Sequence, residues 1–281
     1  MMKKHLLLIL TLPLLLTSCY SYNTDSDISY GEYKERNLLD IAFPNKKETS
    51  LVVFIHGGGW IGGSKANYAK EFANKYDDGY IYAAINYRYV NNEYHCDDIL
   101  NDINNAMNKI KEVCDTKGYK VNKAAFFGHS AGGHLSLLYA YKMKDVCPFN
   151  VSFVSSLSGP TDLTDTNFIN NTIIGNTYYE LMTYMTGFEI NESNFSSYKD
   201  ELLKYSPINY ISNACPTIIC HGNIDDVVPL SNALTLKEKL DATNIEHEFF
   251  LYGGTGHALD NDKKSERQYE RKFKQYKAKY L

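Results

Sequence analysis

Three features are missing from this sequence, and each absence excludes a class of protein. None of the six cysteines stands in Cys-x-x-Cys spacing, so neither a zinc site nor a thioredoxin-type redox motif is indicated. The apolar run from Leu6 to Leu16 is shorter than the ~20 residues that a membrane-spanning helix needs. A formal net charge of −4 argues against a nucleic-acid-binding protein.

The body of the chain also has no internal repeat, no low-complexity tract and no proline-rich linker. Of its 281 residues, 44% are hydrophobic and 22% are charged, which is an ordinary globular composition. A chain of this length can bury a large core within one domain. We therefore expect one domain, which we place at residues 28–281.

The basic C-terminal stretch is better explained by packing than by binding to a polyanion. Tyr269, Phe273, Tyr276 and Tyr280 follow one another at helical spacing and form one apolar face. We expect a helix at 263–279 that docks through this face and leaves its lysines in solvent.

The N-terminus has the pattern of an export signal. Two lysines, the apolar run and a few small polar residues follow one another, as in secretory signals. The letters LTSC at 16–19 resemble the lipobox of bacterial lipoproteins, which implies a signal peptide at 1–18 and a lipid on Cys19. We expect residues 19–27 to be a flexible tether and the protein to be exported and lipid-anchored at the bacterial cell envelope. A plain signal peptide cut nearby is the alternative.

The five cysteines outside this signal cannot all pair with one another. We expect them to be small buried hydrophobic residues, although export would permit one disulfide. They are Cys96, Cys114, Cys147, Cys215 and Cys220.

Apolar strand-like runs alternate with longer helical patterns along the chain. The predicted strands are Leu51–Ile55, Tyr80–Asn86, Ala124–Phe127, Val151–Leu157, Thr217–Cys220 and Glu248–Tyr252, and the predicted helices are 66–76, 97–117, 132–144, 231–242 and 263–279. Such alternation favours a mostly parallel sheet covered on both faces. Residues 28–44 are expected to add an antiparallel edge hairpin, and residues 163–205 break the rhythm as a lid-like insertion.

A glycine-rich loop directly follows the first buried strand. Gly57, Gly59 and Gly62 satisfy the G-x-G-x-x-G pattern, but the next strand ends in Asn86 rather than in the carboxylate that a dinucleotide site needs. A phosphate-binding P-loop needs the order Gly-Lys-Ser/Thr, whereas residues 63–65 read Gly-Ser-Lys. Both nucleotide interpretations therefore fail.

The letters HGGGW at 56–60 fit a third template, a loop whose backbone N–H groups hold an oxyanion. This interpretation requires a nucleophile at a strand-to-helix turn. Ser130 provides it within Gly-His-Ser-Ala-Gly at 128–132, between an apolar strand and a helical pattern. This turn exposes the hydroxyl at a helix N-terminus, where negative charge is stabilised.

A serine hydroxyl needs a histidine base, and that histidine needs an orienting acid. In the order nucleophile, acid, base, His257 fits best because it follows a strand that runs into a glycine loop. The other downstream histidines, His134, His221 and His247, stand in the wrong place or order. For the acid, the residues leave three candidates open, Asp225, Asp226 and Asp162.

Taken together, these motifs resemble the α/β-hydrolase fold esterases, in particular the hormone-sensitive-lipase-like group and bacterial acetyl-esterase and feruloyl-esterase-type enzymes. The matching stretches are LDIAFP, HGGGWIGGSK, GHSAGGH, SPINYI, HGNIDDVVP and GTGHAL, which span nearly the whole mature chain. The resemblance implies an α/β-hydrolase fold, a mostly parallel sheet of about eight strands flanked by helices with a small lid insertion. It places the catalytic acid four residues after the histidine of HG, at Asp225.

The implied chemistry is ester hydrolysis through an acyl-enzyme, by Ser130, Asp225 and His257. The resemblance implies an oxyanion hole from the N–H groups of Gly58, Gly59 and Ala131, and no metal or organic cofactor. Trp60, His129 and Tyr184 are candidate substrate-binding residues, and other lid side chains, Tyr178, Tyr179, Met182 and Met185, could line an acyl pocket.

The expected substrates are small acyl or aryl esters, including acetyl or feruloyl esters of carbohydrates. Aryl-formamidase or peptidase activity remains an alternative, because relatives with those activities share an HGG-type loop or the Ser-x-Gly-Gly sequence at 130–133. A non-catalytic binding protein is a third interpretation, although neither Ser130 nor His257 has been lost.

Overall fold

The computed structural model describes residues 20–169 and 177–281. The predicted signal peptide at 1–18 and Cys19 lie outside the described residues. Within the described ranges, no helix combines the length and apolar character needed to cross a bilayer.

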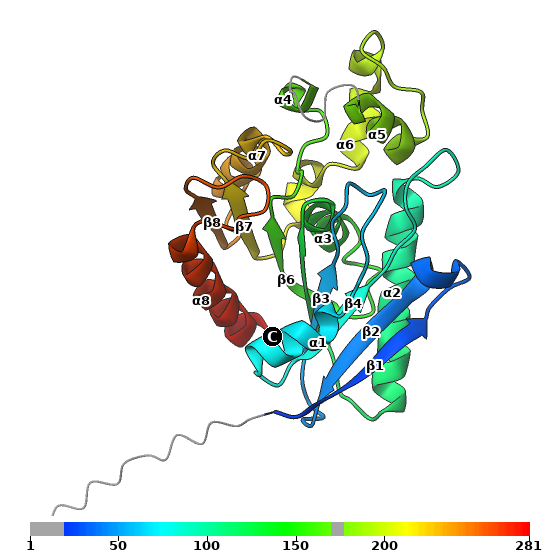
Figure 1. Ribbon diagram of the computed structural model, residues 1–281, viewed down its shortest axis with the longest axis vertical. Coiled ribbons are helices and arrows are strands. Elements are labelled where there is room, and N and C mark those ends of the chain that lie inside the picture. The colour runs from blue at the N-terminus through cyan, green and yellow to red at the C-terminus, as the bar shows by residue number, and fades with distance from the viewer. Residues whose placement is uncertain (1–19, 170–176) are drawn as a thin grey trace, which may run out of the picture.

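The core of the molecule is one sheet of eight strands, in the order β1-β2-β4-β3-β5-β6-β7-β8. The strands are β1 Tyr22–Ser29, β2 Leu38–Pro44, β3 Leu51–Ile55, β4 Ile81–Ile85, β5 Lys123–His129, β6 Asn150–Leu157, β7 Thr217–Gly222 and β8 His247–Tyr252. Only the pairs β1–β2 and β2–β4 are antiparallel, and the rest of the sheet is parallel (Figure 1). The predicted sheet is therefore confirmed.

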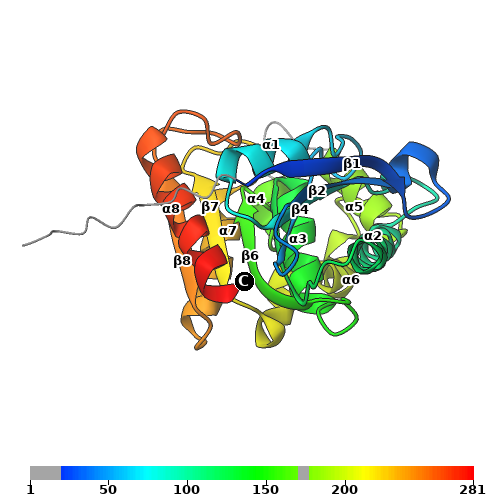
Figure 2. The same ribbon diagram turned by 90° about the horizontal axis from the view of Figure 1, so that it is seen from below.

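Helices cover both faces of this sheet, as Figure 2 shows. They are α1 Tyr68–Tyr76, α2 Cys96–Thr116, α3 Ala131–Lys142, α7 Leu230–Asp241 and α8 Lys263–Tyr280, close to the predicted bounds. Along β3, Val52 and Phe54 pack with side chains of α1 and α8, whereas the alternate residues pack with those of α2, α3 and α7. Because both faces are covered, every residue of β3 is buried, which explains its unbroken apolar sequence.

The edge hairpin begins earlier than its sequence indicates. β1 starts at Tyr22 and pairs with β2 as far as Pro44, and the backbone N–H of Tyr20 donates to Asp77 at 2.8 Å. The prediction of a flexible tether at 19–27 is therefore wrong for residues 22–27. An edge strand that is largely open to solvent carries many polar residues, and its sequence is easily mistaken for a linker.

The insertion after β6 forms short helices above the carboxyl edge of the parallel strands (Figure 1). They are α4 Thr166–Ile169, α5 Thr177–Thr186, the 3-10 helix η2 Phe195–Tyr198 and α6 Lys199–Lys204, before the 3-10 helix η3 Pro207–Asn213 leads into β7. The described parts of the predicted lid-like segment at 163–205, residues 163–169 and 177–205, thus lie over the edge where sites form in such sheets.

The five cysteines in the described ranges are all free, and all but Cys147 are buried. Burial raises the pKa of the Cys96 thiol and of the Cys220 thiol, so both stay protonated. The expectation of small buried hydrophobic residues holds for four of them, and no disulfide joins these five.

The C-terminal helix α8 docks through the predicted face, with Tyr269, Phe273 and Tyr276 buried. One lysine departs from the expectation of a solvated basic face. The Lys277 side chain is 1% exposed and its Nζ donates to Asp78 and to the Tyr82 hydroxyl. Burial lowers the pKa of Lys277 to about 8, against the attraction of the Asp78 carboxylate.

We expect Phe273→Ala to lower the free energy of unfolding by about 3–5 kcal/mol, because it empties the centre of an aromatic cluster. The Phe273 ring lies 5.4 Å from the ring of Phe127 and 5.7 Å from that of Tyr76, measured between centroids. Urea denaturation measures the change. The exposed neighbour Lys274 is the control, and Lys274→Ala should change stability by less than about 0.5 kcal/mol. Equal effects of the two substitutions would contradict this packing.

Candidate active site

Ser130 stands at the sharp turn between β5 and α3. Its φ of 57° is in the left-handed region, which a residue with a side chain rarely adopts. The turn is possible because glycines flank it: a Cβ on Gly132 would lie 2.0 Å from the carbonyl oxygen of Ile55. The strained turn exposes the Ser130 hydroxyl at the N-terminus of a helix of 12 residues.

His257 and Asp225 meet above the ends of β7 and β8. The Nδ1–H of His257 donates to the Asp225 carboxylate, 2.9 Å from one oxygen and 3.1 Å from the other. The carboxylate is buried and also accepts the backbone N–H groups of Val227 and Val228, both at 2.9 Å. Burial alone would raise the pKa of Asp225, but these hydrogen bonds and the nearby imidazole lower it, so the group is ionised.

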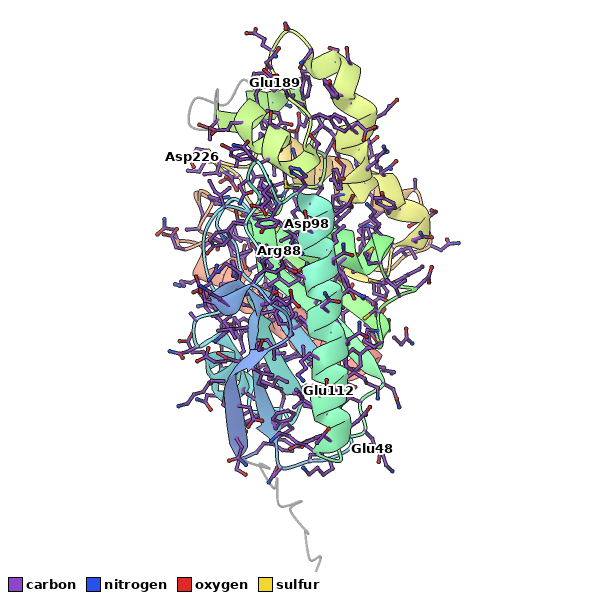
Figure 3. The ribbon with its side chains drawn as sticks, turned by 90° about the vertical axis from the view of Figure 1, so that its right-hand side faces the viewer. Glu48, Arg88, Asp98, Glu112, Glu189 and Asp226 are labelled. Atoms are coloured by element: carbon purple, nitrogen blue, oxygen red, sulfur yellow. The ribbon has the colours of Figure 1, made fainter. Side chains whose placement is uncertain are left out.

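The other two acid candidates do not reach this histidine. Asp226 is exposed at the surface, at the end of the molecule where the lid lies (Figure 3). Asp162 accepts hydrogen bonds from the backbone and hydroxyl of Thr164. The structure therefore brings Asp225, and neither of its competitors, to His257.

The remaining histidine candidates have other partners. Nε2–H of His134 donates to the carbonyl of Tyr205 at 2.7 Å, and His247 pairs with Asp241. His221 is buried behind the acid, with Nε2 at 3.4 Å from the Asp225 carboxylate and 2.9 Å from the Val228 carbonyl.

His129 connects the turn at Ser130 to the loop that carries His257. It precedes Ser130, and its Nε2–H donates to the His257 carbonyl at 2.7 Å. The two imidazole centroids are 4.9 Å apart. Within residues 20–169 and 177–281, the hydrogen bonds of the His257 ring go to Asp225, and none joins it to the Ser130 hydroxyl. Such bonds are often long in unliganded enzymes and tighten with substrate.

The glycine loop after β3 approaches the same turn. A Cβ on Gly57 would lie 2.7 Å from the carbonyl oxygen of His129 and 3.3 Å from the Cβ of Ser130. Gly58, Gly59 and Trp60 follow with φ values of 114°, 60° and 63°. This run of positive φ bends the loop next to the turn at Ser130.

An apolar pocket of about 50 Å³ opens beside Ser130. Its wall comes from the glycine loop after β3, the turn at Ser130, the loop that follows Asp225, and the lid helices after β6. The lining residues are Gly59, Trp60, Ser130, Ala131, Pro160, Leu163, Phe168, Tyr178, Leu181, Met182, Val227 and Val228. This volume holds only a few water molecules, so it suits a small group.

The pocket includes some of the expected substrate-binding residues and omits others. Trp60 lines it and is held by a hydrogen bond from its Nε1–H to His134 Nδ1 at 3.1 Å. Tyr184 does not line it, because its hydroxyl donates to Glu180 on the outer side of α5. His129 lies behind the turn and not in the pocket. Val227 and Val228 were not anticipated; only their place directly after the acid could have indicated them.

Chemically, this arrangement combines a hydroxyl on a helix N-terminus, an imidazole oriented by a buried carboxylate, and a glycine-rich loop next to the hydroxyl. Those are the parts that acyl transfer needs. In the part of the chain that the structure describes, no cluster of three or more His, Cys, Asp or Glu side chains could hold a metal ion.

Residues 39–240 match the family model described as BD-FAE. The matched range begins in β2 and ends in α7, so it includes Ser130 and Asp225. His257 follows it.

Curated relatives and solved structures are also similar. The probable carboxylic ester hydrolase LipM of Mycobacterium tuberculosis is 30% identical over 233 residues, which cover 78% of this chain and 52% of LipM. The isoprenylcysteine alpha-carbonyl methylesterase ICME of Arabidopsis thaliana is 26% identical over 88% of this chain and 60% of its own length. The chain spans little more than half the length of these curated relatives. A truncated carbohydrate esterase from gut microbiota superposes with a TM-score of 0.75 at 20% identity, over 93% of this chain and 98% of that one.

We expect Asp225→Asn to lower kcat for an ester by about a thousandfold or more, because an amide cannot hold His257 in the required tautomer. The measurement is steady-state hydrolysis of p-nitrophenyl acetate. Asp226→Asn is the matched control and should leave kcat within about twofold. A large loss with Asp226→Asn and none with Asp225→Asn would overturn the assignment of the acid.

Proposed function

Since this chain belongs to the BD-FAE family and has the α/β-hydrolase fold, we propose that it is a serine hydrolase of carboxylic esters. The observation that carries the proposal is the contact between His257 and a buried Asp225, next to the strained turn of Ser130 and its pocket. The names of the curated relatives, a carboxylic ester hydrolase and a methylesterase, support the same class of reaction.

In the proposed mechanism, Ser130 attacks the ester carbonyl and forms a tetrahedral intermediate. His257 takes the serine proton on Nε2 and passes it to the leaving alcohol, while Asp225 stabilises the imidazolium. The N–H groups of Gly58, Gly59 and Ala131 hold the oxyanion; one such donor contributes about 3 kcal/mol. Water, activated by His257, then hydrolyses the acyl-enzyme and restores the serine.

The pocket favours a short acyl group. The small volume beside Ser130, about 50 Å³, favours an acetyl group over the larger feruloyl group. Of the two carbohydrate esters expected from the sequence, we therefore favour acetyl esters. The similarity to a carbohydrate esterase supports the fold, and the size of the cavity supports this choice.

The proposed location is the bacterial cell envelope, with a lipid on Cys19. The lipobox-like letters at 16–19 support it. Because Tyr20 is bound to Asp77 and β1 begins at Tyr22, a lipid on Cys19 would hold the domain directly at the membrane surface rather than on a long tether.

Wild-type protein is expected to hydrolyse p-nitrophenyl acetate, and kcat/KM is expected to fall steeply for acyl chains longer than butyryl, because the apolar pocket is small. Ser130→Ala should reduce turnover to background. A series of p-nitrophenyl esters from acetate to octanoate measures both effects.

Ser136, buried in the same helix α3, gives the matched control, and Ser136→Ala should retain wild-type turnover. Persistent turnover in Ser130→Ala would refute the nucleophile assignment. A rate that is flat from acetate to octanoate would refute the short-acyl proposal only.

In a bacterial host fed alkyne-tagged palmitate, the full chain should acquire the tag and partition into detergent, since acylation of Cys19 adds apolar chains. Cys19→Ala should lose both properties. Cys147→Ala, at a half-buried cysteine, is the control and should keep them. A tag that survives in Cys19→Ala, or is absent from the wild type, would refute lipid anchoring at this residue.

A further inference from the structure

The glycine loop has two layers of backbone, a first layer at residues 57–58 and a second layer at residues 62–63. A Cβ on Gly58 would lie 2.3 Å from the carbonyl oxygen of Gly62, and one on Gly63 would lie 2.3 Å from the carbonyl oxygen of Gly57. The backbone of 62–63 therefore packs directly against that of 57–58. A shift of residues 62–63 would therefore move residues 57–58, which lie next to the turn at Ser130.

The second layer is tied to the edge hairpin by Lys65. Its Nζ lies 2.6 Å from the Asp40 carboxylate on β2 and 2.8 Å from the Asp27 carboxylate on β1. Lys65 is 8% exposed and Asp40 3%, and the Asp40 oxygen also accepts the Asp27 backbone N–H at 2.8 Å. Burial disfavours the ammonium, but the two carboxylates outweigh it and raise the pKa of Lys65, so the group is charged.

Further hydrogen bonds fix the same layer from neighbouring elements. The backbone N–H of Lys65 donates to the Asn86 side chain at 2.6 Å, and Asn86 is in turn bonded through its N–H to Leu38. The Gly63 carbonyl accepts from Arg36, on the 3-10 helix η1 Lys34–Asn37, at 3.2 Å. The loop is thus held at one end by β3. At its other end it is held by the edge hairpin and by η1, which connects the two strands of that hairpin.

We propose that Lys65 is a positioning residue for the hydrolytic reaction. Its ammonium, clamped between Asp40 and Asp27, holds residues 62–65 so that the amides of Gly58 and Gly59 stay aimed at the developing oxyanion. The proposal rests on the function proposed above. Because these amides bind the transition state more strongly than the substrate, loss of the clamp acts on kcat and leaves KM largely unchanged.

Lys65→Met keeps the aliphatic stem and removes the charge. It is expected to lower kcat for p-nitrophenyl acetate by about tenfold to a hundredfold, with KM within about twofold. A trifluoromethyl ketone, which forms a tetrahedral adduct with serine, should bind more weakly by the same factor as kcat/KM falls. Lys65→Arg, which can pair with both carboxylates, should restore most of kcat.

Lys117→Met is the matched control. It removes another ion pair of β1, from Lys117 to Asp25 at 2.8 Å, that has no contact with the loop, and it should leave kcat unchanged. Since Lys65→Met leaves Asp40 buried without its cation, the double variant Lys65→Met/Asp40→Asn removes that charge too. The Tm of the double variant should be closer to that of the wild type than the Tm of Lys65→Met is, and its kcat should remain low.

The outcomes separate this proposal from the proposed function. If Ser130→Ala is inactive but Lys65→Met, or the folded double variant, keeps the kcat of Lys117→Met, the positioning role is overturned and the hydrolase assignment stands. If Ser130→Ala remains active, the assignment itself fails, whatever Lys65→Met does.

Discussion

The site depends on the close approach of backbones that side chains would keep apart. Three such contacts lie at the carboxyl edge of the sheet. The start of α3 lies against the carbonyl of Ile55, and the glycine loop lies against the turn at Ser130. The loop after β7, which carries Asp225, lies against the loop after β8, which carries His257. In the last of these contacts, a Cβ on Gly222 would lie 2.4 Å from the carbonyl oxygen of Gly256. Each contact joins two segments distant in sequence, and each is possible only because one of them carries glycine there. The geometry of the proposed catalytic side chains follows, since Ser130, Asp225 and His257 stand within a few residues of these contacts.

Electrostatics around His257 follow from burial. Four other histidines lie close to the loops that form the site, His56, His129, His134 and His221. Burial lowers the pKa of all four, to about 4 for His56 and His134, so they are uncharged at neutral pH. Two of them hold neighbouring parts in place through neutral hydrogen bonds: His129 binds the His257 backbone and His134 accepts from Trp60. The positive charge that the proposed reaction places on His257 therefore meets the Asp225 carboxylate without a competing cation among these rings.

Most of the sheet and of its helices could be predicted from the sequence, because strands buried on both faces are continuously apolar and the helices between them carry one apolar face. The same alternation predicted which loops meet at the carboxyl edge of the sheet. It therefore limited the candidates for the nucleophile, the acid and the base to residues in those loops. What escaped prediction depends on contacts between distant residues. Residues 22–27 are polar like a linker, but they pair with β2. Lys277 is basic, but its side chain is buried and paired with the Asp78 carboxylate. Tyr184 is aromatic, but its hydroxyl donates to Glu180. The partner in each case comes from tertiary structure and leaves no local pattern.

Both ends of the described chain lie at the amino edge of the parallel strands. Tyr20 is bound to Asp77, just before β4, and the carbonyl of Leu281 accepts from Ser50, just before β3. The lid helices lie over the other edge (Figure 1). The pocket beside Ser130 is lined by residues of that lid and of the loops at this edge. A lipid, a carrier protein or a solid support joined to either end would therefore leave the mouth of the pocket unobstructed. This polarity makes the domain well suited to immobilisation or to fusion through either end, since neither needs a redesigned connection around the loops at the carboxyl edge.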